Sequence, residues 1–360
     1  MKVAVLGVGE MGRTVIEHLK ECELVTSILA YDINSKNLQI AKQKYGVKIT
    51  EELNEVLNDA SISLVFITSP NDSHKDLALK AMASNKAVLC EKPMALTLED
   101  AEKMVQYAED KNIFFQIGFE LRYSKLYTKV KEWIDRGLLG DIINTQCTYI
   151  SSQYPECEEW VWRCKSESCG STFGERLSHY VDLPRWWIGS QVKDIYAVCA
   201  PNVIPYYEVH DNYHANYHFD NGAVSQITFM SIAAFFEGDA LKNVIDQQVG
   251  DGHALRYRII GTRGMAETSV FDRYIRRWEF YPSGDKFKSQ WIENLTWPSH
   301  EDHFYFHNTT DQTKDVVKRV AQGQKPMTPA RNALQTMKVC FAAELSADEK
   351  RIVSLEELNH

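Results

Sequence analysis

The sequence has no apolar run approaching the ~18 residues that a membrane-spanning helix needs, and no excess of positive charge. Its 40 Lys and Arg residues are outnumbered by 49 Asp and Glu residues, which gives a formal net charge of −9 at pH 7. Because such a field repels polyanions, we expect neither a nucleic acid nor a membrane among the partners. The first residues pass directly into a strand pattern without the features of a signal peptide, which predicts a cytoplasmic protein.

The sequence also lacks the closely paired cysteines of a zinc site, and any low-complexity segment, internal repeat or long linker. Six and four residues separate Cys157, Cys164 and Cys169, and several other cysteines lie in apolar runs, as buried, reduced thiols do. The three histidines of His300–His307 have near-helical spacing, but a pocket wall or solvated face is favoured there, so no metal is predicted. A chain of 360 residues is long enough for two domains, which should be tightly joined.

Residues 1–121 alternate strand patterns with helical patterns, which is typical of a parallel sheet covered by helices. The first strand is followed by the string Gly7-x-Gly9-x-x-Gly12 and a helical run, and Asp32 ends the second strand. In that context the glycines allow a tight turn, the approach of a pyrophosphate and close helix packing. Asp32 can bind an adenosine ribose and would repel a 2′-phosphate, which favours NAD over NADP. We therefore predict a doubly wound α/β Rossmann domain.

Two further segments follow buried strands and should lie beside the cofactor, since ligands bind at the carboxyl ends of parallel strands. The first is the turn Thr68–His74, and the second is Cys90–Pro93, in which Lys92 would face a substrate hydroxyl next to the nicotinamide. The predicted cofactor-binding residues are Gly7, Gly9, Glu10, Met11, Gly12, Asp32, Thr68, Ser69, Asn71, His74, Glu91 and Lys92.

Residues 122–360 predict an α+β domain with an open, mostly antiparallel sheet. From Asp141 onward the pattern has mostly a period of two, and Asp220-Asn221-Gly222 is a strong hairpin signal between two such runs. An exposed sheet face would carry an apolar patch, so we expect a homodimer or homotetramer.

The helical pattern of this second domain carries a candidate proton-transfer group. Glu175, His179 and Asp182 are spaced i, i+4 and i+7, which places them on one face of an α-helix. A carboxylate one turn from a histidine can fix its tautomer and raise its basicity. A histidine so placed can take a hydroxyl proton near neutral pH, which makes His179 the predicted general base.

Together these segments resemble the Gfo/Idh/MocA family of nicotinamide oxidoreductases over nearly the whole chain. The matching residues are the glycine loop with Asp32, Thr68 to His74, Glu91-Lys92-Pro93, Gly118-Phe119 with Arg122, Trp162-Arg163, and His179 with Asp182. The resemblance implies that Lys92 works with His179 and an acid, which is Glu175 here in place of the family's usual Asp. It also implies that the helices after residue 308 pack back towards the first domain.

We predict an oxidoreductase that transfers hydride between NAD and a secondary alcohol or ketone of a sugar, polyol or cyclitol. His179 would act as base, Lys92 as polariser and Glu175 as their acidic partner, while Asp182, Arg122, Arg163 and Trp162 would bind the substrate. One alternative is a sugar-modifying enzyme whose tightly bound NAD is recycled through oxidation, elimination and reduction. A second alternative is a dinucleotide-binding sensor or scaffold without catalysis.

Overall fold

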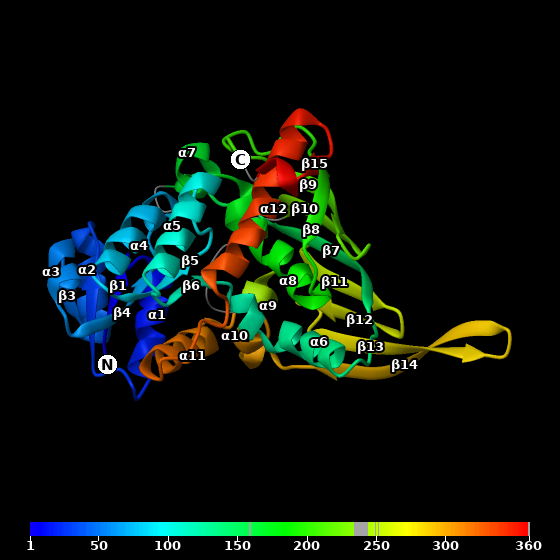
Figure 1. Ribbon diagram of the computed structural model, residues 1–360, viewed down its shortest axis with the longest axis horizontal. Helices are drawn as coiled ribbons and strands as arrows, with labels where there is room; N and C mark the ends of the chain where they lie inside the picture. The colour runs from blue at the N-terminus through cyan, green and yellow to red at the C-terminus, as the bar shows by residue number, and fades with distance from the viewer. Residues whose placement is uncertain (158–159, 234–243, 249, 251, 359–360) are drawn as a thin grey trace. The chain divides into compact units, whose positions relative to one another are not determined.

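The structure is a computed structural model that describes residues 1–360 except 158–159, 234–243, 249, 251 and 359–360 (Figure 1). The chain divides into two compact units. The first comprises Met1–Glu120, Glu167–Gly170 and Thr309–Met337, and the second comprises Leu121–Ser166, Ser171–Asn308 and Lys338–His360.

The first unit contains a sheet in the order β3-β2-β1-β4-β5-β6, with every described pair of neighbours parallel. Its strands are β1 (Lys2–Leu6), β2 (Ser27–Tyr31), β3 (Lys48–Thr50), β4 (Ile62–Ile67), β5 (Ala87–Glu91) and β6 (Phe115–Gly118). The chain order reverses between β1 and β4, which makes this edge the switch point where such sheets bind ligands. The predicted Rossmann fold is confirmed.

Helices pack against this sheet through apolar side chains at helical spacing. They are α1 (Glu10–Lys20), α2 (Ser35–Tyr45), α3 (Leu53–Asn58), α4 (His74–Ala83), α5 (Leu98–Asp110) and α11 (Thr309–Ala321). The side chains of Val15, Ile16 and Leu19 in α1 share a core with β1, and Val316 and Val317 of α11 join the same core. Segment 309–321 therefore belongs to the unit that carries the glycine loop.

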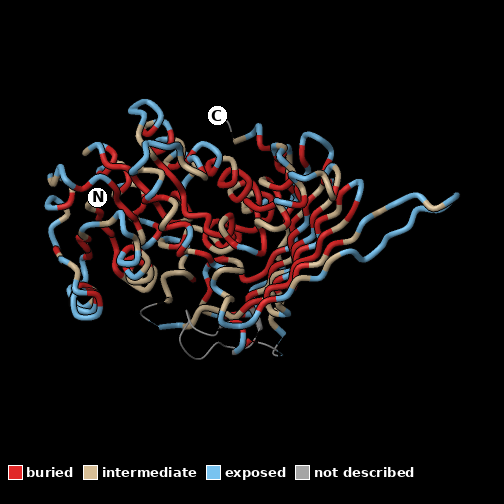
Figure 2. Tube along the Cα trace, turned by 90° about the horizontal axis from the view of Figure 1, so that it is seen from below, coloured by how far each residue is buried: buried red, intermediate tan, exposed pale blue. Residues whose placement is uncertain are grey.

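The second unit contains a sheet in the order β14-β13-β12-β11-β7-β10-β9-β8-β15, in which only β7 and β10 are parallel among the described pairs. Its strands are β7 (Ile142–Ser152), β8 (Val192–Val198), β9 (Asn212–Phe219), β10 (Val224–Ala233), β11 (Ala254–Gly261), β12 (Gly264–Ser269), β13 (Tyr274–Ser283), β14 (Lys286–Thr296) and β15 (Val353–Ser354). The mostly antiparallel sheet and the hairpin predicted at Asp220-Asn221-Gly222 are confirmed. Figure 2 shows that β13 passes from buried to exposed towards the tip of its hairpin with β14, whose residues are exposed or intermediate throughout.

One face of this second sheet is covered by helices, which share its apolar core. They are α6 (Lys125–Asp135), α8 (Ser178–Ile188), α9 (Val244–Gln247), α10 (Asp302–Tyr305) and the part of α12 (Ala330–Glu349) from Lys338 onward, whereas most of the short helix α7 (Ser166–Cys169) belongs to the first unit. Within α8, Pro184 cannot donate the usual hydrogen bond to the carbonyl oxygen of Tyr180. The hydroxyl of Tyr257 donates to that oxygen at 2.6 Å, so the sheet replaces the bond that the helix lacks.

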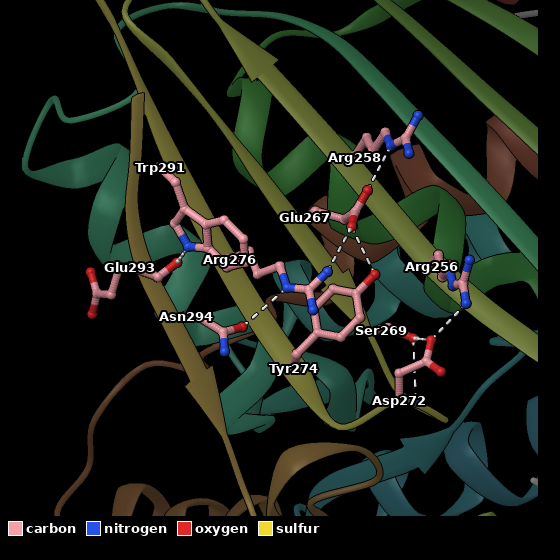
Figure 3. A network of polar contacts seen from close by, with 10 residues as sticks. All are labelled: Arg256, Arg258, Glu267, Ser269, Asp272, Tyr274, Arg276, Trp291, Glu293 and Asn294. Carbon is pink, nitrogen blue, oxygen red and sulfur yellow. Dashed lines mark hydrogen bonds and ion pairs between the residues drawn. The ribbon is translucent and has the colours of Figure 1, made fainter. Parts of the chain in front are cut away.

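The part of the open sheet face formed by β11, β12 and β13 is charged, where an apolar patch was expected. Figure 3 shows Arg258 and Tyr274 donating to the carboxylate of Glu267, both at 2.7 Å, and Arg276 lying over the Tyr274 ring. The prediction of an apolar patch is wrong for this region. The side chains that point away from the helix-covered face here include paired charges, such as Arg258 with Glu267. The described helices include none that is both long and apolar enough to cross a membrane.

Candidate active site

The glycine loop between β1 and α1 has one position that opens onto free space. A Cβ atom at Gly7, whose φ is +87°, would lie 2.6 Å from the Ser69 Cα atom, and one at Gly12 would lie 2.0 Å from the Gly7 carbonyl oxygen. A Cβ atom at Gly9, by contrast, would have no neighbour within 4 Å. Gly7 and Gly12 are thus required by packing within the protein, whereas Gly9 leaves room at the amino end of α1. That room, with the amide groups of the first helical turn, fits a pyrophosphate.

Asp32 follows β2 and holds the glycine loop in place. Its carboxylate accepts hydrogen bonds from the amides of Val8 and Asn34, both at 2.8 Å, and from the Asn37 side chain at 3.2 Å. The residue is 7% exposed. A carboxylate fixed beside the ends of β1 and β2 could also accept hydrogen bonds from the hydroxyls of a bound ribose.

The turn after β4 contacts both the glycine loop and the loop after β5. The Thr68 hydroxyl donates to the Gly7 carbonyl oxygen at 2.6 Å. The His74 ring lies within hydrogen-bonding distance of two carbonyl oxygens, with Nδ1 2.8 Å from Pro93 and Nε2 2.9 Å from Ser69. Burial lowers the pKa of His74, against the opposing effect of these two carbonyls. His74 therefore joins two loops through their backbones.

Other predicted cofactor residues lie at the same edge of the sheet. Asn71 is buried and donates from its side chain to the carbonyl oxygen of Cys169 at 3.1 Å. A Cβ atom at Gly118 would lie 2.7 Å from the Glu91 carboxylate, so the glycine lets this acid pack against β6. Lys92 directly follows β5 and is partly exposed. The strand ends that carry the predicted cofactor residues therefore gather within the first unit.

His179 lies in the first turn of α8 in the second unit and is 3% exposed. Its ring faces that of His307 with the ring centroids 6.0 Å apart and the planes at 74°. The sequence singled out His307 only as part of a pocket wall or solvated face. The structure brings these two imidazoles together from segments more than a hundred residues apart.

Glu175 lies in a π-helical turn, Phe173–Leu177, immediately before α8. The prediction that Glu175 shares an α-helical face with His179 and Asp182 assumed unbroken α-helix and is wrong in that respect, because the π-helical turn has a different angular spacing. The Glu175 side chain, 2% exposed, forms an ion pair with Arg163 and accepts a hydrogen bond from the Tyr154 hydroxyl at 3.2 Å. Its charge is therefore compensated by Arg163.

Arg122 and Asp182, which the sequence proposed as substrate-binding groups, form a buried ion pair. Nε and Nη2 of Arg122 donate to the two carboxylate oxygens of Asp182 at 2.6 and 2.7 Å. The two side chains are 7% and 1% exposed. The Arg122 guanidinium also lies 5.7 Å from the ring centroid of Trp186. The pair joins the short helix Glu120–Tyr123 to the helix that carries His179.

Sequence reasoning did not identify Tyr154, which lies in the segment after β7. Its hydroxyl lies 3.4 Å from Arg163 and 3.3 Å from Arg176, besides its bond to Glu175. The available signal was its position shortly before the aromatic segment Trp160–Arg163. Within the described residues, no group of three His, Cys, Asp or Glu side chains could hold a metal ion.

Two family models match the chain. A model described as an oxidoreductase family with an NAD-binding Rossmann fold matches residues 1–119. A model of the Gfo/Idh/MocA carboxy-terminal domain matches residues 127–267.

The chain is also similar to individual dehydrogenases. It is 24% identical to myo-inositol 2-dehydrogenase of Thermotoga maritima, with 99% of each chain aligned. It is 32% identical to glucose-6-phosphate 3-dehydrogenase of Bacillus subtilis over 52% of this chain and 53% of that relative. The solved structure of levoglucosan dehydrogenase with NADH and levoglucosan shares the fold, with a TM-score of 0.79 over 99% of each chain at 21% identity.

Proposed function

The chain belongs to the Gfo/Idh/MocA family and is an NAD-dependent oxidoreductase; from this premise we propose that it transfers hydride to or from a secondary alcohol or ketone of a sugar, polyol or cyclitol. One observation carries the proposal: the ends of β1, β2, β4 and β5 gather a glycine loop with room at Gly9, an acid at Asp32 and a cation at Lys92. Relatives named as inositol and levoglucosan dehydrogenases support this substrate class.

The first unit would hold the cofactor. The amides that follow Gly9 would bind the pyrophosphate, and Asp32 would bind the adenosine ribose. When bound, NAD supplies the hydride acceptor. Lys92, as a cation, would polarise the reacting oxygen and stabilise the negative charge that develops on it.

The second unit would supply the base and the substrate contacts. We assign the base to His179, because imidazole titrates near neutral pH whereas a lysine needs burial or a nearby cation to do so. The Arg122–Asp182 pair favours a positioning role, in which it fixes the helix that carries His179. Trp162 and Arg163 would contact the substrate. That the protein forms a homodimer or homotetramer, and that it lies in the cytoplasm, both stay predictions.

The test is NADH formation on a panel of sugars, polyols and cyclitols. On an accepted substrate, Lys92→Met and His179→Asn should each lower kcat/KM by about 10²- to 10⁴-fold, the usual loss for a proton-transfer group. Two exposed residues give matched controls, Lys80→Met on α4 and His218→Asn on β9, which should retain wild-type kcat/KM. If Lys92→Met and His179→Asn behave like their controls, the assigned roles are wrong.

The surroundings of Glu175 favour a second candidate function. Its carboxylate is paired with Arg163, and it lies in a π-helical turn instead of on one α-helical face with His179. In this case the enzyme would oxidise a sugar transiently, eliminate a group and reduce the product again, with NAD retained throughout. NAD that copurifies with the protein, together with product formation without net NADH, would establish it. Stoichiometric NADH formation would exclude it.

A further inference from the structure

Arg163 uses only part of its hydrogen-bonding capacity. Within the described part of the chain, its hydrogen bonds leave from Nη1, towards the Glu175 carboxylate and the Tyr154 hydroxyl. Its buried Nε has no hydrogen-bond partner among the described residues. The edge that carries Nε and Nη2 is the same edge through which Arg122 binds the carboxylate of Asp182.

From this unpartnered Nε we infer that Arg163 binds a carboxylate group of the substrate, so that the substrate is a sugar acid rather than a neutral polyol. The inference rests on the proposed function, whose substrate class it narrows. An arginine edge with two parallel N–H groups matches the two oxygens of a carboxylate. The side chain of Arg163 is 24% exposed overall, although its Nε atom is buried, so a carboxylate that pairs with this edge would itself be largely removed from water.

The charges around Arg163 favour a second anion. Arg163 and Arg176 both interact electrostatically with the carboxylate of Glu175. The hydrogen bonds of Arg176 go to neutral acceptors, including the hydroxyl of Ser231 at 2.7 Å and the carbonyl oxygen of Ser152 at 3.0 Å. Two guanidinium groups therefore share one carboxylate, and neutral acceptors do not cancel the remaining charge.

The shape of the site suits a small planar group. The guanidinium carbon of Arg163 lies 4.6 Å from the ring centroid of Trp162, 5.1 Å from that of Tyr154 and 5.2 Å from that of Trp160. A cavity of about 10 Å³ lies against Arg163 and Glu175 and is lined by Tyr207 among others. Such a volume holds about one water-sized group, so it has room for one of the two carboxylate oxygens. A tetrahedral phosphate is bulkier and carries more charge than one open edge can match.

The experiment compares sugar acids with their neutral counterparts on the NAD-loaded full chain. Glucuronate is paired with glucose, galacturonate with galactose and gluconate with sorbitol, and glucose 6-phosphate is added as a second anion. Binding is measured by titration calorimetry, and kcat/KM by NADH formation. We expect at least one acid to exceed its neutral partner by about 100-fold or more, because a site built for a polar group rejects the analogue that lacks it.

Substitutions then attribute the preference to Arg163. Arg163→Gln should reduce the acid-over-neutral ratio to within about threefold, while Arg163→Lys, which keeps the charge but loses the two-pronged edge, should give an intermediate ratio. Lys165→Gln removes the same charge from an exposed residue two positions away, which pairs with Glu208, and should leave the ratio unchanged. Circular dichroism checks that each variant is folded. If Arg163→Gln does not fold, the acid-over-neutral ratio of Arg163→Lys is compared with that of the wild type instead.

Three results would overturn the inference. They are equal use of acids and neutral sugars, a preference for the phosphate over the carboxylates, or a preference that survives in both Arg163 variants. Turnover of neutral polyols without any acid preference would leave the proposed function standing and remove the inference alone. Binding of a sugar acid that depends on Arg163, but without oxidation, would support the inference and contradict the proposed function.

Discussion

The buried ion pair between Arg122 and Asp182 gives a prediction that separates a structural role from substrate binding. In Asp182→Ala, the Arg122 guanidinium stays buried without the two carboxylate oxygens that now lie 2.6 and 2.7 Å from its nitrogens. Arg185 is affected too, because burial lowers its pKa to about 10 and the negative charge of Asp182 opposes that effect. The substitution therefore leaves two poorly solvated cations close to α8.

The expected cost follows from the burial of both partners, whose side chains are 7% and 1% exposed. Breaking a buried pair by removing one partner costs about 3–5 kcal/mol. For a domain of roughly 150–250 residues, each kcal/mol lowers Tm by roughly 2–4 °C, so Tm of the second unit should fall by about 6–20 °C.

The assay is thermal unfolding followed by calorimetry or circular dichroism. Arg136→Ala breaks an exposed pair with Glu132, whose side chains are 60% and 44% exposed, and should cost no more than about 1 kcal/mol. The double variant Arg122→Met, Asp182→Leu removes both charges and should recover most of the loss. If Asp182→Ala unfolds at the wild-type temperature and only raises KM, the pair is not structural and direct substrate binding is favoured.

Three further predictions concern the cofactor site and pH. Gly9→Ala should unfold like the wild type, because its Cβ atom would have no neighbour within 4 Å. It should nevertheless weaken NAD binding about 10-fold or more, as measured by calorimetry. Gly12→Ala should lose stability as well, because its Cβ atom would lie 2.0 Å from a carbonyl oxygen. An unchanged Kd in Gly9→Ala would place the pyrophosphate elsewhere. Asp32→Ser should raise the ratio of kcat/KM for NADP to that for NAD by about 10-fold or more, since the repulsion of a 2′-phosphate is lost, and an unaltered ratio would contradict the ribose assignment. Burial raises the pKa of Glu344, so ionisation favours the unfolded state, and wild-type stability should fall as pH rises from the unfolded pKa of about 4.3 through the raised folded value. Glu344→Gln should lack this fall in urea unfolding, and parallel curves for the two proteins would refute the argument.

The fold, and the loops that bring the predicted cofactor residues to one edge of the sheet, could be predicted from sequence because their determinants are local. Gly7, Gly9 and Gly12 stand in one loop between a strand and a helix, and the contact of Asp32 with the Val8 amide follows from the pairing of adjacent strands. Strand alternation and hairpin signals likewise depend on neighbouring residues. Such patterns predict an element and its end without knowledge of distant partners.

The rest of the site depends on partners that no local pattern identifies. Arg122 and Asp182 are 60 residues apart, and both read equally well as substrate ligands until their ion pair is known. Glu175 was assigned to an α-helical face, but the π-helical turn and the ion pair with Arg163 determine its surroundings. Tyr154 has no charge or motif to mark it, although its hydroxyl contacts both arginines and the carboxylate.

The proline in α8 has a consequence for how this scaffold can change its chemistry. Because the Tyr257 hydroxyl replaces the internal bond to the Tyr180 carbonyl oxygen, sliding or turning α8 would break a contact with β11. This hydrogen bond fixes the helix at Tyr180, the residue after His179. The position of the His179 imidazole therefore depends on the sheet on which α8 packs. Loops around α8 could therefore differ without moving His179, the proposed base, whereas Tyr257→Phe would remove this contact from within the core.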